Sequence, residues 1–78
     1  MSKFREWRYH QASRRSWTQF LRGRITIIGL RNELWHHWLR LNGGLNNVNK
    51  TMTPEEIRKK RDDIKNEIHI VLREYTSI

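Results

Sequence analysis

The chain has 78 residues, of which 36% are hydrophobic and 31% charged, with no cysteine and a net charge of +8. A chain of this length forms one small domain and buries only about 60–65% of the surface that it exposes when unfolded. Because it has no disulfides and no thiolate metal sites, its stability must come from helices, self-association or a partner. These limits exclude an elaborate substrate cleft, so we do not expect an enzyme.

Hydropathy predicts neither a membrane span nor a secretory signal. The longest apolar cluster covers only residues 25–30, whereas a membrane-spanning helix needs roughly 20 apolar residues. The N-terminal residues lack the apolar segment of a secretory signal. The absence of cysteine fits a reducing compartment, so the prediction is a cytoplasmic protein without membrane contact.

Basic and aromatic residues are concentrated in the first half of the chain. Residues 1–24 carry a net charge of +6, whereas residues 51–78 carry equal numbers of basic and acidic side chains. All aromatic residues except Tyr75 lie within the first 38 positions. This asymmetry predicts that the N-terminal half presents a surface rich in arginine and aromatic rings to a partner.

The first predicted elements cover residues 1–42. Residues 1–15 are expected to form a basic, aromatic arm or a short helix, because no residue caps them convincingly. The segment from Ser16 to Gln19 has the spacing of a capping box, which predicts a helix over 16–42. The segment 24–28 is rich in β-branched residues and could form a strand, but no second strand is available to pair with it, so helix is favoured. Gly43 then offers a left-handed cap.

The core of this helix is predicted from its apolar spacing. A face with helical periodicity is formed by Leu30, Leu34, Trp38 and Leu41, widened by Trp35 and Leu39. We expect three tryptophans to contribute to the core, namely Trp17, Trp35 and Trp38. Trp7 lies in the least regular segment beside an arginine, so it is the tryptophan expected to be exposed.

The second half of the chain predicts a loop and a helix. Residues 43–52 are rich in Gly and Asn and are predicted to connect the helices. Thr53, Pro54 and Glu56 occupy the N-cap, first and third positions of a helix predicted over 53–76. Its apolar stripe consists of Ile57, Ile64, Ile68, Val71 and Tyr75, with Arg61 in the remaining position.

These elements predict one small all-α domain, a helical hairpin of two long helices preceded by the basic arm or short helix. We expect the stripe on the last helix to pack against the preceding helix. The alternative is a homo-oligomer that forms through residues 57–75, because a chain this small gains core by self-association.

No motif typical of catalysis or metal binding is present. The residues Ser13, Ser16 and His10 do not form a nucleophile arrangement, and the glycines lack the spacing of a phosphate loop. Glu33, His36 and His37 suggest a metal site, because Glu33 and His36 share a helix face, but a carboxylate-bridged site needs a second such motif, which the chain lacks. We therefore predict no catalytic residue, metal or cofactor.

The N-terminal half carries the functional prediction. Arginines neutralise phosphates and release counterions, and aromatic rings between them can stack on bases. We predict a small, basic, non-enzymatic nucleic-acid-binding protein, with DNA and RNA left open. The predicted contacts are Arg5, Trp7, Arg8, Tyr9, Arg14, Arg15, Arg22 and Arg24.

Other interpretations fit the same composition. Trp, Tyr and Arg are enriched at binding hot spots, so the segment could dock on an acidic partner protein as an inhibitor or adaptor. A structural subunit with an arm that is ordered only in an assembly is a further alternative, as is a solvated basic face over core tryptophans. In size and charge alone, the chain resembles small proteins made by phages and other mobile elements.

Overall fold

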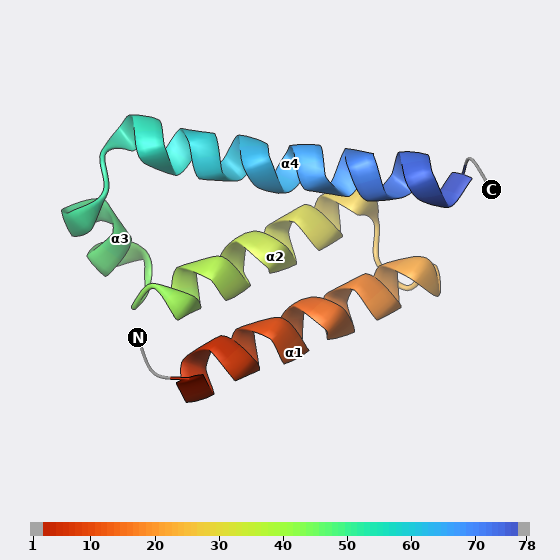
Figure 1. Ribbon diagram of the computed structural model, residues 1–78, viewed down its shortest axis with the longest axis horizontal. Helices are drawn as coiled ribbons and strands as arrows, with labels where there is room; N and C mark the ends of the chain where they lie inside the picture. Colours follow the sequence, from red (N-terminus) through yellow and green to blue (C-terminus); the bar gives the residue numbers. More distant parts are fainter. Residues whose placement is uncertain (1–2, 77–78) are drawn as a thin grey trace.

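The computed structural model describes residues 3–76, which form four α-helices (Figure 1). The helices are α1 (Lys3–Leu21), α2 (Ile27–Leu41), α3 (Leu45–Thr51) and α4 (Pro54–Thr76). These residues contain no strand, so the predicted all-α class is confirmed. Helix α2 lies between α1 and α4 and packs against both, in a molecule that measures 41 × 28 × 19 Å. Within the same residues, no helix has the length and apolarity needed to cross a bilayer.

The start of the chain differs from the prediction. Residues 3–15 are not an arm or a separate short helix but the first part of α1, which continues through Ser16. Ser16 caps no helix, because its side chain is 2% exposed and hydrogen-bonds to Glu33 and His37 of α2. The capping-box spacing was misleading because partners distant in the sequence, rather than the local backbone, satisfy the hydroxyl.

The single helix predicted over 16–42 is also wrong, because Gly23 ends α1. Gly23 adopts φ 74°, its amide donates to the Phe20 carbonyl at 3.0 Å, and the Arg24 amide donates to the Gln19 carbonyl at 2.9 Å. This is a Schellman cap, which favours glycine at the left-handed position. Thr26 then caps α2, with its Oγ1 accepting from the Gly29 amide at 3.1 Å. Of the segment 24–28, residues 24–26 are therefore a turn, whereas residues 27–28 begin α2, so the favoured helix is confirmed only for these last two positions.

The predicted end of α2 is confirmed, but the segment after it contains a helix. Gly43 adopts φ 89°, and its amide donates to the Arg40 carbonyl at 3.2 Å in a second Schellman cap. Residues 45–51 of the predicted loop form α3. Val48 is fully buried against Trp38 and Leu39. The Asn content indicated a loop, but burial of this valine stabilises a short helix.

The capping box of α4 is confirmed. The Thr53 amide donates to Glu56 Oε1 at 3.0 Å, and the Glu56 amide donates to Thr53 Oγ1 at 3.2 Å. The bond from the Thr53 backbone lowers the pKa of the Glu56 carboxyl, and the Thr53 side chain adds to the shift. The helix ends at Thr76, where the prediction placed its end.

The core is built on α2. Leu30 and Leu34 of α2 form one buried cluster with Ile64 and Ile68 of α4, and Trp17 and Trp35 are partly buried against it. A second cluster joins Trp38 and Leu39 to Val48 of α3. The core positions predicted for the three tryptophans are therefore confirmed, as is the exposure of Trp7.

The stripe on α4 follows the prediction only as far as Ile68. Beyond it, Leu72 packs on the core, whereas Val71 is 36% exposed and Tyr75 is 62% exposed. A straight helix drifts from a strict seven-residue repeat, which moves the contact to the neighbouring position. The guanidinium of Arg61 lies 4.9 Å from the ring centroid of Trp35, so a cation–π contact covers this gap in the stripe.

Candidate functional site

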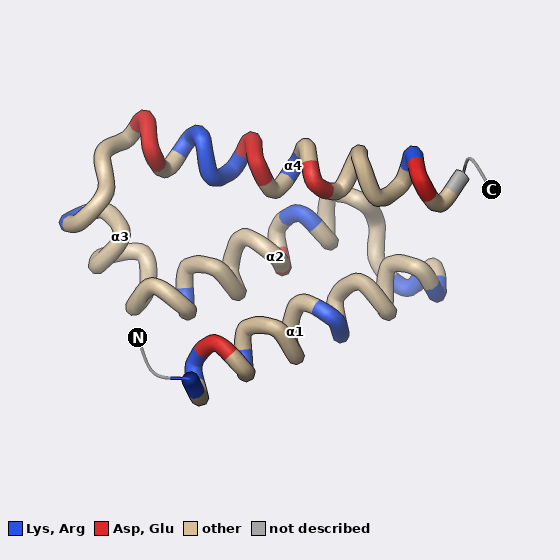
Figure 2. Tube along the Cα trace, viewed as in Figure 1, with Lys and Arg blue, Asp and Glu red and all other residues tan. Residues whose placement is uncertain are grey.

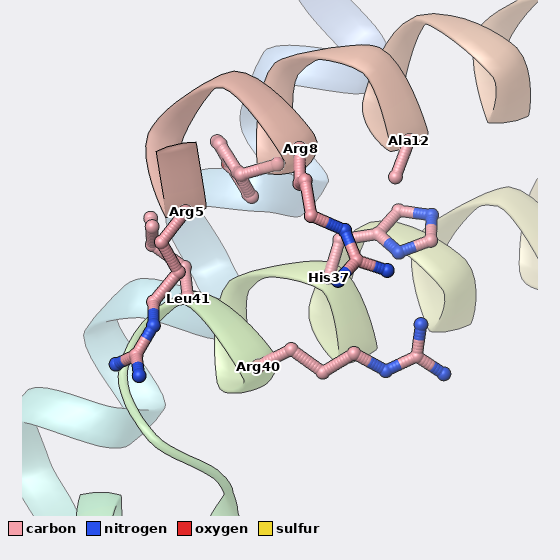
Figure 3. Close-up of a pocket in the computed structure, with 7 residues that line it drawn as sticks. Arg5, Arg8, Ala12, His37, Arg40 and Leu41 are labelled. Atoms are coloured by element: carbon pink, nitrogen blue, oxygen red, sulfur yellow. The ribbon is translucent and has the colours of Figure 1, made fainter. Parts of the chain in front are cut away.

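A cavity of about 240 Å³ lies between the start of α1 and the end of α2 (Figure 3). None of the described residues that line it is acidic. The lining consists of Arg5, Arg8, Tyr9 and Ala12 from α1, and His37, Arg40 and Leu41 from α2. Three guanidinium groups thus border one small space.

Helical spacing and chain reversal together explain this cluster. The lining positions of α1 are 5, 8, 9 and 12, and those of α2 are 37, 40 and 41, so each set recurs about once per helical turn and occupies one helix face. The turn between Gly23 and Thr26 reverses the chain, and the start of α1 then lies beside the end of α2 (Figure 1).

The side chains in the cavity favour an anion. Figure 3 shows the guanidinium of Arg8 crossing from α1 toward His37, while Arg40 runs alongside from α2 and Arg5 points to the opposite end. Positive groups gathered in a concave surface raise the local potential, and guanidinium groups bind phosphate and carboxylate oxygens through paired hydrogen bonds. The arrangement can therefore hold an oxyanion.

A buried polar network connects α1 and α2 beside the cavity. Ser16 Oγ donates to Glu33 Oε1 at 2.7 Å and lies 2.9 Å from His37 Nε2. The hydroxyl has one proton, which is given to the carboxylate, so His37 Nε2 must be the donor to Ser16. His37 Nδ1 is then an acceptor, and this buried atom has no hydrogen-bond partner among the residues that the structure describes. The network fixes the orientation of the imidazole that lines the cavity.

This network differs from a catalytic triad in the direction of its hydrogen bonds. In a triad, histidine takes the serine proton and the carboxylate accepts from the other ring nitrogen. Here Glu33 accepts from Ser16 itself, and the serine side chain is almost fully buried. The three residues thus connect two helices through hydrogen bonds that do not have the directions of a triad. No group of three or more His, Asp or Glu side chains within residues 3–76 could hold a metal ion.

Two titratable groups in the cavity wall have pKa values that differ from their ordinary ones. Burial lowers the pKa of His37, and Arg40 lowers it further while Glu33 opposes the shift. Burial also raises the pKa of the Tyr9 hydroxyl, with a further contribution from Glu67. Both shifts favour the neutral forms, so the positive charge of the cavity comes from its arginines.

The structure brings together only part of the predicted contact set. Arg5, Arg8 and Tyr9 line the cavity, and Tyr9 also packs against the Trp38 cluster. The remaining predicted arginines are exposed outside the cavity, along α1 and in the turn after it (Figure 2). They are Arg14, Arg15, Arg22 and Arg24.

Trp7 lies on α1 outside the cavity lining. Its ring is 58% exposed and stacks on Phe4, which is 67% exposed, with centroids 6.3 Å apart. Phe4 was not among the predicted contacts, although it stands three residues before Trp7, a spacing that pairs side chains on a helix.

His37 and Arg40 were also absent from the predicted contacts, although His37 belongs to the pattern that suggests a metal site. Both belong to α2, outside the strongly basic segment 1–24, so charge by region did not indicate them. The sequence signal that could have indicated these two residues is Gly23, which ends one helix, followed by Thr26, which caps the next. A chain reversal there predicts that the end of α2 lies beside the start of α1.

No protein-family model, curated protein or solved structure matches this chain. Its function must therefore be inferred from the cavity and the surface around it.

Proposed function

We propose that the protein binds nucleic acid without catalysing a reaction on it, and that a backbone phosphate occupies the cavity. One observation supports this above all: Arg5, Arg8 and Arg40 come from two helices to border one space, and its described lining contains no carboxylate. Arginine suits this task because its planar fork can contact two phosphate oxygens at once.

The distribution of charge outside the cavity supports an extended contact. Exposed basic residues continue along α1 and into the turn after it, whereas basic and acidic positions alternate along α4 (Figure 2). A phosphate chain would therefore follow the α1 side of the molecule. Each neutralised phosphate releases counterions, so affinity should decrease steeply with salt.

An acidic protein surface is the second candidate partner. The exposed pair of Phe4 and Trp7 beside Arg8 has the residue types found at protein hot spots. The two candidates predict different ligands. A nucleic-acid-binding protein should bind an oligonucleotide of any sequence, whereas a protein that docks on an acidic partner need not bind one.

The test compares two double variants with the same change in net charge. R8Q/R40Q removes two cavity arginines, whereas K59Q/K65Q removes two exposed lysines of α4. Binding of a labelled oligonucleotide of mixed sequence is measured by fluorescence anisotropy over a series of salt concentrations. We expect R8Q/R40Q to weaken binding about tenfold or more and to lower the salt slope by roughly 1.4–1.8. The lysine variant should change both quantities much less.

Two results would contradict the proposal. If the unmodified protein binds no oligonucleotide even at low salt, the nucleic-acid function is wrong and an acidic protein becomes the better candidate. If both variants weaken binding equally, net charge rather than the cavity supplies the affinity. Circular dichroism of both variants checks that their helix content is unchanged.

A further inference from the structure

The start of α1 exposes two large aromatic rings side by side. Phe4 and Trp7 are both more than half exposed, and their ring planes differ by 21° at a centroid separation of 6.3 Å. The other three tryptophans are buried or partly buried against the core clusters. Single exposed apolar residues are ordinary, but a contiguous aromatic pair indicates a surface that contacts something.

Arg8 connects this aromatic pair to the cavity. Its guanidinium carbon lies 5.8 Å from the centroid of the Phe4 ring, and the same side chain lines the cavity. Figure 3 shows its head group reaching across toward α2. The rings of Trp7 and Phe4, the guanidinium of Arg8 and the cavity thus form one continuous surface.

We infer that Phe4 and Trp7 are a stacking platform for unpaired bases, so that the nucleic acid bound is a single strand rather than a duplex. This inference rests on the proposed function and specifies its ligand. A phosphate held by Arg8 and Arg40 places the attached nucleotides beside the two rings.

The preference for a single strand follows from which parts of a base are accessible. In a duplex the faces of the bases are covered by their neighbours, and only the edges can be reached. In a single strand the faces are free to stack on aromatic side chains, in a way that tolerates every base. Exposed flat rings beside phosphate-binding arginines fit the second case.

Three probes of similar charge test the inference. They are an oligothymidylate of about 12 nucleotides, an abasic deoxyribose-phosphate strand of the same length, and a duplex with the same number of phosphates. The variant F4A/W7A removes both rings, and the matched control L21A/I28A removes two other exposed apolar side chains of the α1–α2 hairpin. Affinities are measured at one low salt concentration.

We expect the unmodified protein to bind oligothymidylate more tightly than the abasic strand. F4A/W7A should weaken oligothymidylate binding about tenfold to a hundredfold, and leave binding of the abasic strand nearly unchanged. L21A/I28A should bind all three probes like the unmodified protein. Because the removed rings are exposed, abasic-strand binding by F4A/W7A also shows that the variant is folded.

The outcomes separate this inference from the proposed function. If oligothymidylate and the abasic strand bind equally and F4A/W7A has no effect, while R8Q/R40Q weakens both, the phosphate site stands and the platform is wrong. If the duplex binds as tightly as oligothymidylate and loses as much in F4A/W7A, single-strand preference is wrong. If none of the probes binds, both proposals are overturned.

Discussion

Helix α2 contacts its two long neighbours in different ways. Toward α4 the contact is apolar, with Leu30 and Leu34 packed on Ile64 and Ile68. Toward α1 it includes a buried polar network, and Ser16 is the one buried residue in the described part of α1. The comparison shows that the residues buried in the contact with α4 are hydrophobic, whereas the contact with α1 also includes buried polar groups and borders a cavity.

The largest effect should follow from removing a side chain at the apolar contact. Ile68 is fully buried, so Ile68→Ala should reduce the free energy of unfolding by about 2–5 kcal/mol. Val71 is more than one-third exposed, so Val71→Ala should change it by less than about 0.5 kcal/mol. Urea unfolding followed by circular dichroism measures both. Equal losses would contradict the observed shift of the stripe from Val71 to Leu72.

A smaller loss is expected where α1 meets α2. Ser16→Ala leaves the carboxylate of Glu33 and the imidazole of His37 without their shared partner, which should cost about 1–3 kcal/mol. Thr18→Ala is the matched control, because its exposed hydroxyl bonds only to the Arg14 carbonyl one turn earlier. It should stay within about 0.5 kcal/mol of the unmodified protein in the same urea titration. If Ser16→Ala is equally neutral, the polar network does not stabilise the pair of helices.

The turn that makes the α1–α2 pair offers a third test. Gly23 has φ 74°, with no atom near an added Cβ, so Gly23→Ala should destabilise by about 1–2 kcal/mol through the backbone alone. Gly29 lies within α2 and has room for a methyl group, so Gly29→Ala should stabilise by about 0.4–1 kcal/mol. The midpoint of thermal unfolding should be lower than that of the unmodified protein for Gly23→Ala and higher for Gly29→Ala. Shifts of the same sign would contradict a left-handed cap at Gly23.

The sequence predicted the α4 side of the molecule far better than the α1 side. The capping box at Thr53, the end of α2 at Gly43 and the buried face of α2 are all local patterns within one or two helical turns. Local signals of this kind determine where a helix begins, ends and buries its apolar side chains. Predictions from these patterns do not depend on how the chain reverses between α1 and α2.

The candidate site depends on contacts that local patterns do not contain. Ser16 finds its partners 17 and 21 residues away, on a helix that runs back along α1. Arg40 lies beside Arg8 because α2 runs back along α1, although only Arg8 belongs to the strongly basic segment 1–24. The same limit applies to α3, whose Val48 is buried by Trp38 and Leu39 of another helix. The basic segment lines a cavity only because the chain reverses at Gly23 and Thr26, which brings the end of α2 beside the start of α1.

The smallest effect we predict is a pH dependence that arises on the α1 side. Burial and Arg40 hold the pKa of His37 below its ordinary value of 6.5 in the folded protein. Between that lowered pKa and 6.5 the unfolded chain binds more protons, so the free energy of unfolding should decrease as the pH falls through this window. His37→Gln should lose this component, and the matched control His36→Gln, an exposed neighbour that contributes least to the shift, should keep most of it.

The two variants each lack one of two neighbouring histidines and are otherwise identical, so a difference in slope between them is assigned to the partly buried ring of His37. Urea titrations between about pH 5 and pH 8 measure it. Equal slopes for the two variants would contradict the shift at His37. An anion in the cavity favours the protonated imidazole and raises its pKa. By linkage, an oligonucleotide without terminal phosphates, whose backbone charge is constant in this range, should therefore bind more tightly as the pH falls. His37→Gln should reduce that dependence more than His36→Gln does. The described residues buried between α2 and α4 are apolar, so they add nothing to this anion-linked dependence.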